Sequence, residues 1–152
     1  MNSKKYKSEI EKPQIFGYKK PPPELQAKKE VVILCQTPTI RGSVHVVRGG
    51  AGEHLHSHKS VDGFWMVLTG SVAFYGEGDT FYGEFGPGEG ILMPRNNRYW
   101  FESVGDDDAE IVQVLHFDKG KVFDREDHEE AKFDRAEIKV LVGRKQMPKP
   151  ST

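Results

Sequence analysis

Three histidines, His54, His56 and His58, occupy alternate positions of one short segment. If that segment is a β-strand, alternate residues share one face, so the three imidazoles point the same way. Consecutive members then lie roughly 6.6 Å apart along the strand, close enough for two imidazoles to reach one metal ion. The outer pair is about twice as far apart, so a single ion takes two of the three. Imidazole suits Zn, Fe, Ni, Mn or Cu, and the pattern therefore predicts a divalent transition metal without choosing one.

A fourth histidine, His116, is a further candidate metal ligand. It lies in a strand-like segment whose alternating partners, Val112 and Val114, are apolar. A lone histidine on an apolar strand face is more often a packed core residue, and this reading stays open for His116. For the other three, the corresponding alternative is a set of solvated or core histidines.

Arginines and aromatic residues supply candidates for substrate binding. An arginine pairs with carboxylates and phosphates through two parallel hydrogen bonds, although exposure on the surface is its commoner fate. We expect Arg98, and with it Arg41, to contact an anionic group of a substrate. An aromatic ring at the mouth of a site can stack on a ligand ring, and we assign this role to Trp100 and Tyr82.

Short strands must position these residues. Strand-like segments recur between residues 31 and 117, each rich in β-branched or aromatic side chains and separated by turns rich in Gly and Asp. Many short strands without intervening helices predict an all-β sandwich or barrel. The expected strands are 31–35, 41–48, 53–58, 64–69, 71–75, 80–85, 90–93, 98–104 and 110–117.

The flanking segments differ from this strand-rich region. Residues 1–30 are rich in Lys and contain Pro21-Pro22-Pro23, which favours an extended arm that is either flexible or packed on a partner subunit. The barrel domain is assigned to residues 31–143 and a flexible tail to residues 144–152. Within the domain, residues 124–133 are predicted as a short helix with Asp124 as its N-cap, followed by a strand at 137–142.

Composition excludes several classes of partner. The net charge is −1 over 152 residues, so the basic surface of a nucleic-acid-binding protein is absent. With one cysteine, Cys35, no internal disulfide can form. No apolar run has membrane-spanning length, and the N-terminal segment is polar. We therefore expect a cytoplasmic protein that binds neither nucleic acid nor a membrane.

Two motifs are similar to those of the cupin family. The pattern Gly50-x5-His56-x-His58-x11-Gly70 has the spacing of the first cupin motif, and the segment 86–94, GPGEGILMP, resembles the start of the second. The resemblance covers roughly residues 42–117 and implies an antiparallel jelly-roll β-barrel with its site inside. It also implies a homodimer, which the tendency of open sheet edges to pair supports.

Only part of the family's set of metal ligands is present in this sequence. His56 and His58 match the paired histidines, whereas the glutamate of the family falls at Gly63, next to Asp62, and its last histidine falls at Tyr99. The resemblance therefore implies two of the four usual ligands. Tyr99 could coordinate the ion as a phenolate, exchange a proton with the substrate or hydrogen-bond to it.

These observations leave three functions open. The first is an enzyme in which His56 and His58, with His54 or water, hold a metal ion that acts on a small polar or anionic substrate. The second follows from His56-Ser57-His58-Lys59 and the strand at 67–72, which are similar to metal-independent nucleotide-sugar 3,4-ketoisomerases; there His56 would shuttle a proton. The third is a binding or sensing protein without a reaction. In each, the expected ligand is a small molecule, either a carbohydrate or a carboxylate.

Overall fold

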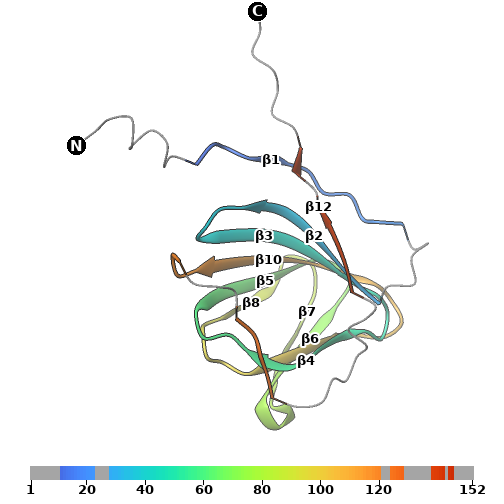
Figure 1. The fold of residues 1–152 in the computed structure, drawn as a ribbon. Coiled ribbons are helices and arrows are strands. Elements are labelled where there is room, and N and C mark those ends of the chain that lie inside the picture. Colours follow the sequence, from blue (N-terminus) through green and yellow to red (C-terminus); the bar gives the residue numbers. More distant parts are fainter. Residues whose placement is uncertain (1–10, 23–27, 121–123, 129–137, 143, 146–152) are drawn as a thin grey trace, which may run out of the picture.

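The computed structural model describes residues 11–22, 28–120, 124–128, 138–142 and 144–145, the last two ranges as backbone alone. Two β-sheets face each other and enclose a single interior (Figure 1). The six-stranded sheet has the order β12 (Ile138–Val142), β2 (Lys29–Gln36), β3 (Ile40–Val47), β10 (Ala109–Phe117), β5 (Val61–Thr69) and β8 (Gly90–Met93). The five-stranded sheet has the order β11 (Glu126–Asp127), β4 (Gly52–Ser57), β9 (Tyr99–Ser103), β6 (Val72–Gly76) and β7 (Phe81–Phe85).

The predicted fold class, an all-β jelly roll, is confirmed. Each of the nine strands expected between residues 31 and 117 is present, with its ends within three residues of the expected ones. The strand expected at 137–142 is β12, which pairs with β2 in parallel, whereas the other strand pairs are antiparallel. The helix expected at 124–133 is wrong in its described part, because residues 126–127 form strand β11. Residues 129–133 lie outside the described residues.

Strand register decides which side chains enter the interior. Strand β10 lies between β3 and β5. Each inward-facing residue of β10 pairs with one inward-facing residue of β3 and one of β5, and the three form a row across the sheet. Because side chains alternate between the two faces, every second row belongs to the interior. Three successive inward rows are Gly63–Leu115–Arg41, Trp65–Gln113–Ser43 and Val67–Ile111–His45.

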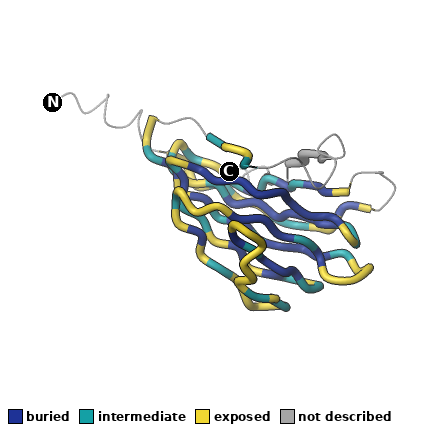
Figure 2. Tube along the Cα trace, turned by 90° about the horizontal axis from the view of Figure 1, so that it is seen from below, coloured by how far each residue is buried: buried dark blue, intermediate teal, exposed yellow. Residues whose placement is uncertain are grey.

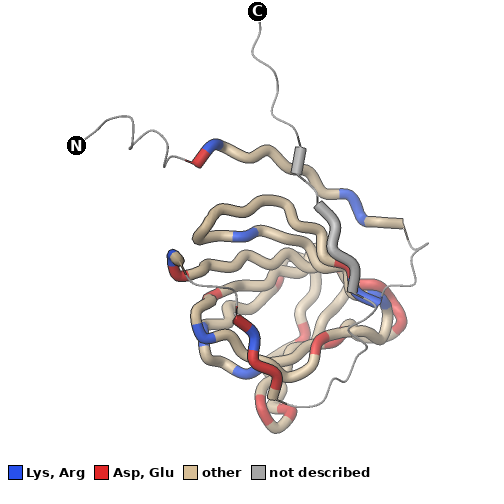
Figure 3. The backbone as a smooth tube through the Cα atoms, viewed as in Figure 1, with Lys and Arg blue, Asp and Glu red and all other residues tan. Residues whose placement is uncertain are grey.

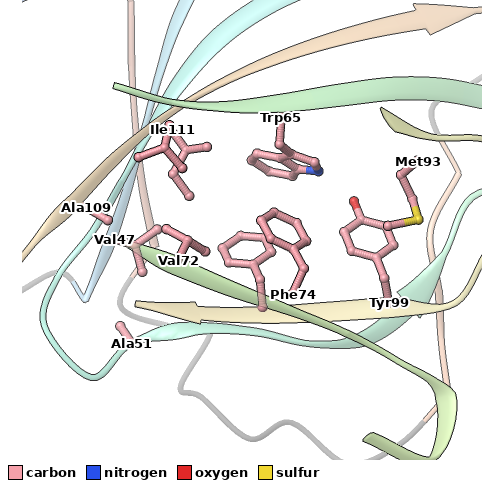
Figure 4. Packing of buried hydrophobic residues seen from close by; sticks show 11 residues of the cluster. Val47, Ala51, Trp65, Val72, Phe74, Met93, Tyr99, Ala109 and Ile111 are labelled. Atoms are coloured by element: carbon pink, nitrogen blue, oxygen red, sulfur yellow. The ribbon is translucent and has the colours of Figure 1, made fainter. Parts of the chain in front are cut away.

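The interior has an apolar half and a polar half. The apolar half is a cluster centred on Trp65, Phe74 and Phe101, whose aromatic rings pack at centroid separations of 5.0 to 6.1 Å (Figure 4). The polar half follows β2, β3 and β4. Its buried members are Lys29, Ser43, His45, Glu53 and His56.

The described part of the N-terminal arm, residues 11–22, crosses the outer face of the six-stranded sheet. Tyr18 packs there against the buried cluster of Val32, Leu34 and Val44, and its hydroxyl donates a hydrogen bond to Glu110. Val32 and Leu34 are buried on this outer face of β2. Figure 2 shows buried residues along the strands of the barrel. The arm therefore completes a second, smaller core.

The outer face also carries side chains that nothing described covers. Phe64, Met66 and Leu92 are exposed on β5 and β8, and the homodimer expected from the sequence remains a prediction. Within the described ranges, we find no helix of the length and apolar character required to cross a membrane.

Replacing Tyr18 with Phe should lower the free energy of unfolding by about 1.5 to 3 kcal/mol, the usual effect of removing a hydrogen bond to a charged group. The physical reason is that Glu110 is 9% exposed and, within the described part of the chain, keeps only the hydrogen bond from Thr69, at 2.7 Å. Urea denaturation followed by tryptophan fluorescence measures the change. Tyr82→Phe, at a side chain that is 44% exposed, is the matched control and should change stability by less than about 0.5 kcal/mol. Equal losses in the two variants would contradict the role of the arm.

Candidate binding site

A β-bulge in β4 sets the direction of the histidines. Glu53 pairs with Phe101 and His56 with Tyr99, so two residues of β4 lie opposite the single residue Trp100. A bulge of this kind restarts the alternation of side chains. Glu53 and His56 therefore both face the interior, and the prediction that His54 shares the face of His56 is wrong.

His54 instead faces the segment 124–128, which we call the strap. Its Nε2 lies 2.9 Å from Asp127 Oδ1 and 3.3 Å from a guanidinium nitrogen of Arg125. The strap pairs with β4 through β11, and Figure 3 shows its alternating charges crossing the barrel beside that strand. His54 is 2% exposed and belongs to this contact rather than to a metal site.

Asp124 anchors the start of the strap. Its carboxylate accepts hydrogen bonds from the backbone N–H groups of Lys59, at 3.1 Å, and Ser60, at 3.4 Å. The residue predicted as a helix N-cap thus caps the turn between β4 and β5. The carbonyl oxygen of Asp124 also bonds Nδ1 of His58, so the strap orients one of the interior imidazoles.

Both interior imidazoles are held through Nδ1. Nδ1 of His56 lies 2.7 Å from the carbonyl oxygen of His54, and Nδ1 of His58 bonds the Asp124 carbonyl. A carbonyl only accepts, so each Nδ1 carries the proton and each Nε2 carries the lone pair. The ring centroids of His56 and His58 are 5.2 Å apart, and this orientation is the one that metal-binding histidines adopt.

The remaining ligands of a metal centre are absent from the described interior. A Cβ atom at Gly63 would lie 2.5 Å from Leu115 Cδ2, so Leu115 fills the place of a glutamate side chain. Asp62, the neighbouring carboxylate, faces outward and accepts a hydrogen bond of 2.8 Å from Arg95. His116 is exposed on the outer face of β10, opposite Asp62.

The donor set therefore does not fit a resident divalent metal. Among the described residues, no three His, Cys, Asp or Glu side chains converge on one point. His54 and His116 face other parts of the structure, which leaves His56 and His58 as two neutral ligands. Two imidazoles without a carboxylate fall short of the three protein ligands typical of an open metal site.

Positive charge accumulates in the polar half of the interior. Lys29 forms a buried ion pair with Glu53, and its ammonium lies 5.3 Å from the centre of the Phe101 ring. Arg125 reaches in from the strap to the other oxygen of Glu53, at 3.0 Å. Arg41 points inward with its guanidinium 5.9 Å from the centre of the Phe117 ring. Two cations thus contact the Glu53 carboxylate, and a third, Arg41, lies in the same interior.

Burial and these charges fix the protonation of the site. Burial lowers the pKa of His56 to about 2, and the positive charge of Arg125 adds to the effect. Burial likewise lowers the pKa of His58. Burial raises the pKa of the Tyr99 hydroxyl to about 12 against the opposing influence of Trp65 and Arg125. At neutral pH the two imidazoles and the phenol are therefore uncharged.

A small pocket opens beside these groups, and its enclosed part has room for about one water molecule. Tyr99 stands at its wall, and its ring centroid is 4.4 Å from that of His56. Figure 4 shows the indole nitrogen of Trp65 facing the Tyr99 hydroxyl, with which it forms a hydrogen bond. The other lining residues are His58, Val61, Gly63, Met93, Pro94, Asn97 and Leu115.

Three of the predicted substrate contacts lie away from this pocket. Arg98 is bound to Glu77 at 2.7 Å on the surface. Trp100 points out of the barrel, where it stacks on Tyr75 at a centroid distance of 4.2 Å and donates to Asp79. Tyr82 is exposed on β7. For Arg98 and Trp100 the cause is the register of β9, which turns Tyr99 inward and its two neighbours outward.

The sequence analysis missed four residues of the polar interior. Lys29, His45, Glu53 and Arg125 are buried or half-buried there. The alternation Lys29, Val31, Ile33 could have indicated a lysine on the inward face of β2. Arg125 carried no such signal, because its position depends on the path of the strap.

The buried histidines predict a loss of stability in mild acid. Because the pKa values of His45 and His56 lie below 6.5 in the folded state, the unfolded chain binds protons that the folded chain does not as pH falls below 6.5. Each histidine should then cost about 1.4 kcal/mol per pH unit. Urea denaturation between pH 7.5 and 5.0 measures the slope. His56→Gln should reduce the slope by about one proton, and an unchanged slope would contradict the assignment.

No protein-family model matches the chain, and no curated protein sequence matches it. Solved structures do resemble it. A conserved protein with a double-stranded β-helix domain from Klebsiella pneumoniae superposes with a TM-score of 0.59 at 15% identity, over 75% of this chain and 92% of that one. The Cnp3 cupin domain of Schizosaccharomyces pombe gives 0.58 at 19% identity, over 67% and 74%. An oxalate oxidase in complex with the substrate analogue glycolate gives 0.55 at 19%, over 69% and 59%.

Identities below 20% in these three pairs indicate a common architecture and leave activity open. The similarity agrees with the two facing β-sheets of this chain. The chain has the fold of the cupin superfamily.

Proposed function

We propose that the chain binds a small organic anion, such as a carboxylate, at the open end of the barrel and does so without a metal ion. The observation that carries the proposal is the charge of the interior. Lys29, Arg41 and Arg125 supply three positive charges, and two carboxylates pair with them: Glu53 with Lys29 and Arg125, and Asp127 with Arg125. In a site of low dielectric constant this excess attracts an anion far more strongly than it would in water.

Tyr99 supplies the directional contact. The indole N–H of Trp65 donates to the Tyr99 oxygen, so the phenolic hydrogen is available to a ligand. Its pKa of about 12 keeps that hydrogen in place at neutral pH. A carboxylate or carbonyl oxygen in the pocket is therefore the natural acceptor.

The protonation of His56 favours binding over catalysis in the empty site. A general base works best when its pKa is near the operating pH. A pKa of about 2 leaves His56 roughly five units below neutrality, which makes it a weak base. The third function weighed from the sequence, a binding or sensing protein, accordingly suits the geometry best.

Metal-independent proton transfer is a second candidate, and the contact between His56 and Tyr99 favours it. A bound anion would offset the charge of Arg125 and raise the pKa of His56 towards neutrality. His56 Nε2 could then take a proton from a carbon beside a carbonyl group while Tyr99 donates to the carbonyl oxygen. The chemistry corresponds to that of an isomerase or epimerase, including one that acts on a nucleotide-linked sugar.

Isothermal titration calorimetry with succinate as the probe tests the proposal. Tyr99→Phe should weaken binding roughly 10- to 100-fold, because it removes one hydrogen bond to a charged group. Tyr82→Phe, on the outer surface, is the matched control and should bind as the wild type does. An absence of succinate binding to the wild type would refute the proposal.

Metal independence is tested with the same titration. Protein treated with EDTA and protein supplied with Zn²⁺, Mn²⁺ or Ni²⁺ should bind succinate with the same affinity within about twofold. Elemental analysis of tag-free protein accompanies the titration. Near-stoichiometric metal that disappears in His56→Ala/His58→Ala, together with weaker binding after EDTA treatment, would restore the metal-dependent alternative.

A further inference from the structure

The pocket is too small for the proposed ligand. Its enclosed part has room for about one water molecule, and even a small carboxylate is larger than that. Strands β5, β9 and β10 form much of the wall, and each of them pairs with a neighbouring strand on both sides. A shift of any of these strands would break its hydrogen bonds to two neighbours. The ligand therefore needs a less firmly held element beside the pocket to move.

The strap is held by polar contacts. None of its residues belongs to the three hydrophobic clusters of the described structure. The ladder between β11 and β4 is two residues long, and one further backbone hydrogen bond of 3.0 Å joins the His128 N–H to the Leu55 carbonyl. A segment with few buried apolar contacts separates from its neighbours at a low cost in free energy. The strap can therefore leave β4 while the apolar core stays intact.

The strap also reaches the site itself. The carbonyl oxygen of Asp124 holds Nδ1 of His58, a residue of the pocket wall. Arg125 extends from the strap to the interior carboxylate of Glu53, at 3.0 Å. The positive charge of Arg125 opposes the rise in the pKa of Tyr99, so its guanidinium is within electrostatic range of the phenol. Movement of the strap would therefore release a wall residue and vacate the space of an arginine side chain beside the site.

Arg125 has donors to spare for a ligand. Its Nε donates to Asp127 at 2.9 Å, and Nη2 contacts Glu53. Among the described residues, none accepts a hydrogen bond from Nη1. A guanidinium binds a carboxylate through two parallel hydrogen bonds, which need two adjacent donors. Nη1 and Nη2 form such a pair once Nη2 leaves Glu53.

We propose that the strap is the lid of the anion site: it separates from β4 to admit the ligand, and Arg125 then binds the ligand carboxylate in place of Glu53. Glu53 keeps Lys29 as its partner during the exchange, so no interior carboxylate is left without a cation. The inference rests on the proposed anion binding and adds the movement that this binding requires.

A disulfide between the strap and β4 tests the movement. Glu126 lies directly opposite Ser57, and such partners have Cα atoms about 4.5 to 5.5 Å apart, a distance that a disulfide spans. In Ser57→Cys/Glu126→Cys, the oxidised protein should associate with succinate at least about tenfold more slowly than the same protein reduced with dithiothreitol. Stopped-flow tryptophan fluorescence measures the rate, because Trp65 lines the pocket. Peptide mass spectrometry confirms the linked positions.

Asp124→Asn tests the movement without a disulfide. It weakens the anchor that the carboxylate forms with the backbone N–H groups of Lys59 and Ser60. The lid should then open more often, and succinate should associate about two- to tenfold faster than with the wild type. Asp107→Asn, in the exposed turn before β10, is the matched control and should associate at the wild-type rate.

Arg125→Gln tests the contact with the ligand. It should weaken the binding of succinate in calorimetric titrations roughly 10- to 100-fold, because it removes hydrogen bonds to a charged group. Arg98→Gln, at an exposed arginine that pairs with Glu77, is the matched control and should bind as the wild type does.

Equal association rates for the oxidised and reduced disulfide variant, or a wild-type rate for Asp124→Asn, would overturn the lid and leave the anion site in place. Wild-type affinity in Arg125→Gln would overturn the role of Arg125. If the wild type itself does not bind succinate, the proposed anion site fails, and the lid fails with it.

Discussion

The ion pair between Lys29 and Glu53 is the interaction on which the interior depends. It joins β2 of one sheet to β4 of the other, and Arg125 extends it to the strap. Burying these charges is costly unless each is paired, so the three elements must come together as a unit. That requirement keeps the polar half of the barrel polar, and it places fixed cations within range of the pocket.

Sequence patterns predicted the fold well because its signals are local. Five of the eight connections between the nine strands carry Gly, the strands themselves are rich in β-branched or aromatic residues, and the nine strands followed from these local features. The candidate site was predicted less well because it depends on how the strands pair and where a bulge shifts their register. The bulge at residues 54 and 55 turned His54 away from His56, and nothing in the spacing of the histidines indicated it. Similarly, Trp100 was correctly placed on a strand, but its ring stacks on Tyr75 instead of lying at the mouth of the pocket.

The strap shows a related limit of local reasoning. Charged residues with an N-capping aspartate are typical of a helix start, and Asp124 does cap exposed backbone N–H groups. Those groups belong to Lys59 and Ser60, which are distant in sequence. The capping chemistry was therefore identified correctly, and only its partner was wrong. Residues 126–127 pair with β4 and therefore form a strand instead of a helix.

Charge also decides between the two kinds of ligand that a histidine-lined barrel can hold. A divalent ion beside His56 and His58 would experience the repulsion of Arg125 and Arg41, which Glu53 and Asp127 offset only in part. An anion in the same place would be attracted by those groups and would find a donor in Tyr99. Leu115 reinforces the choice, because it fills the space in which a glutamate at position 63 would supply the missing negative ligand. The proposed anion site follows from this balance of charge and space.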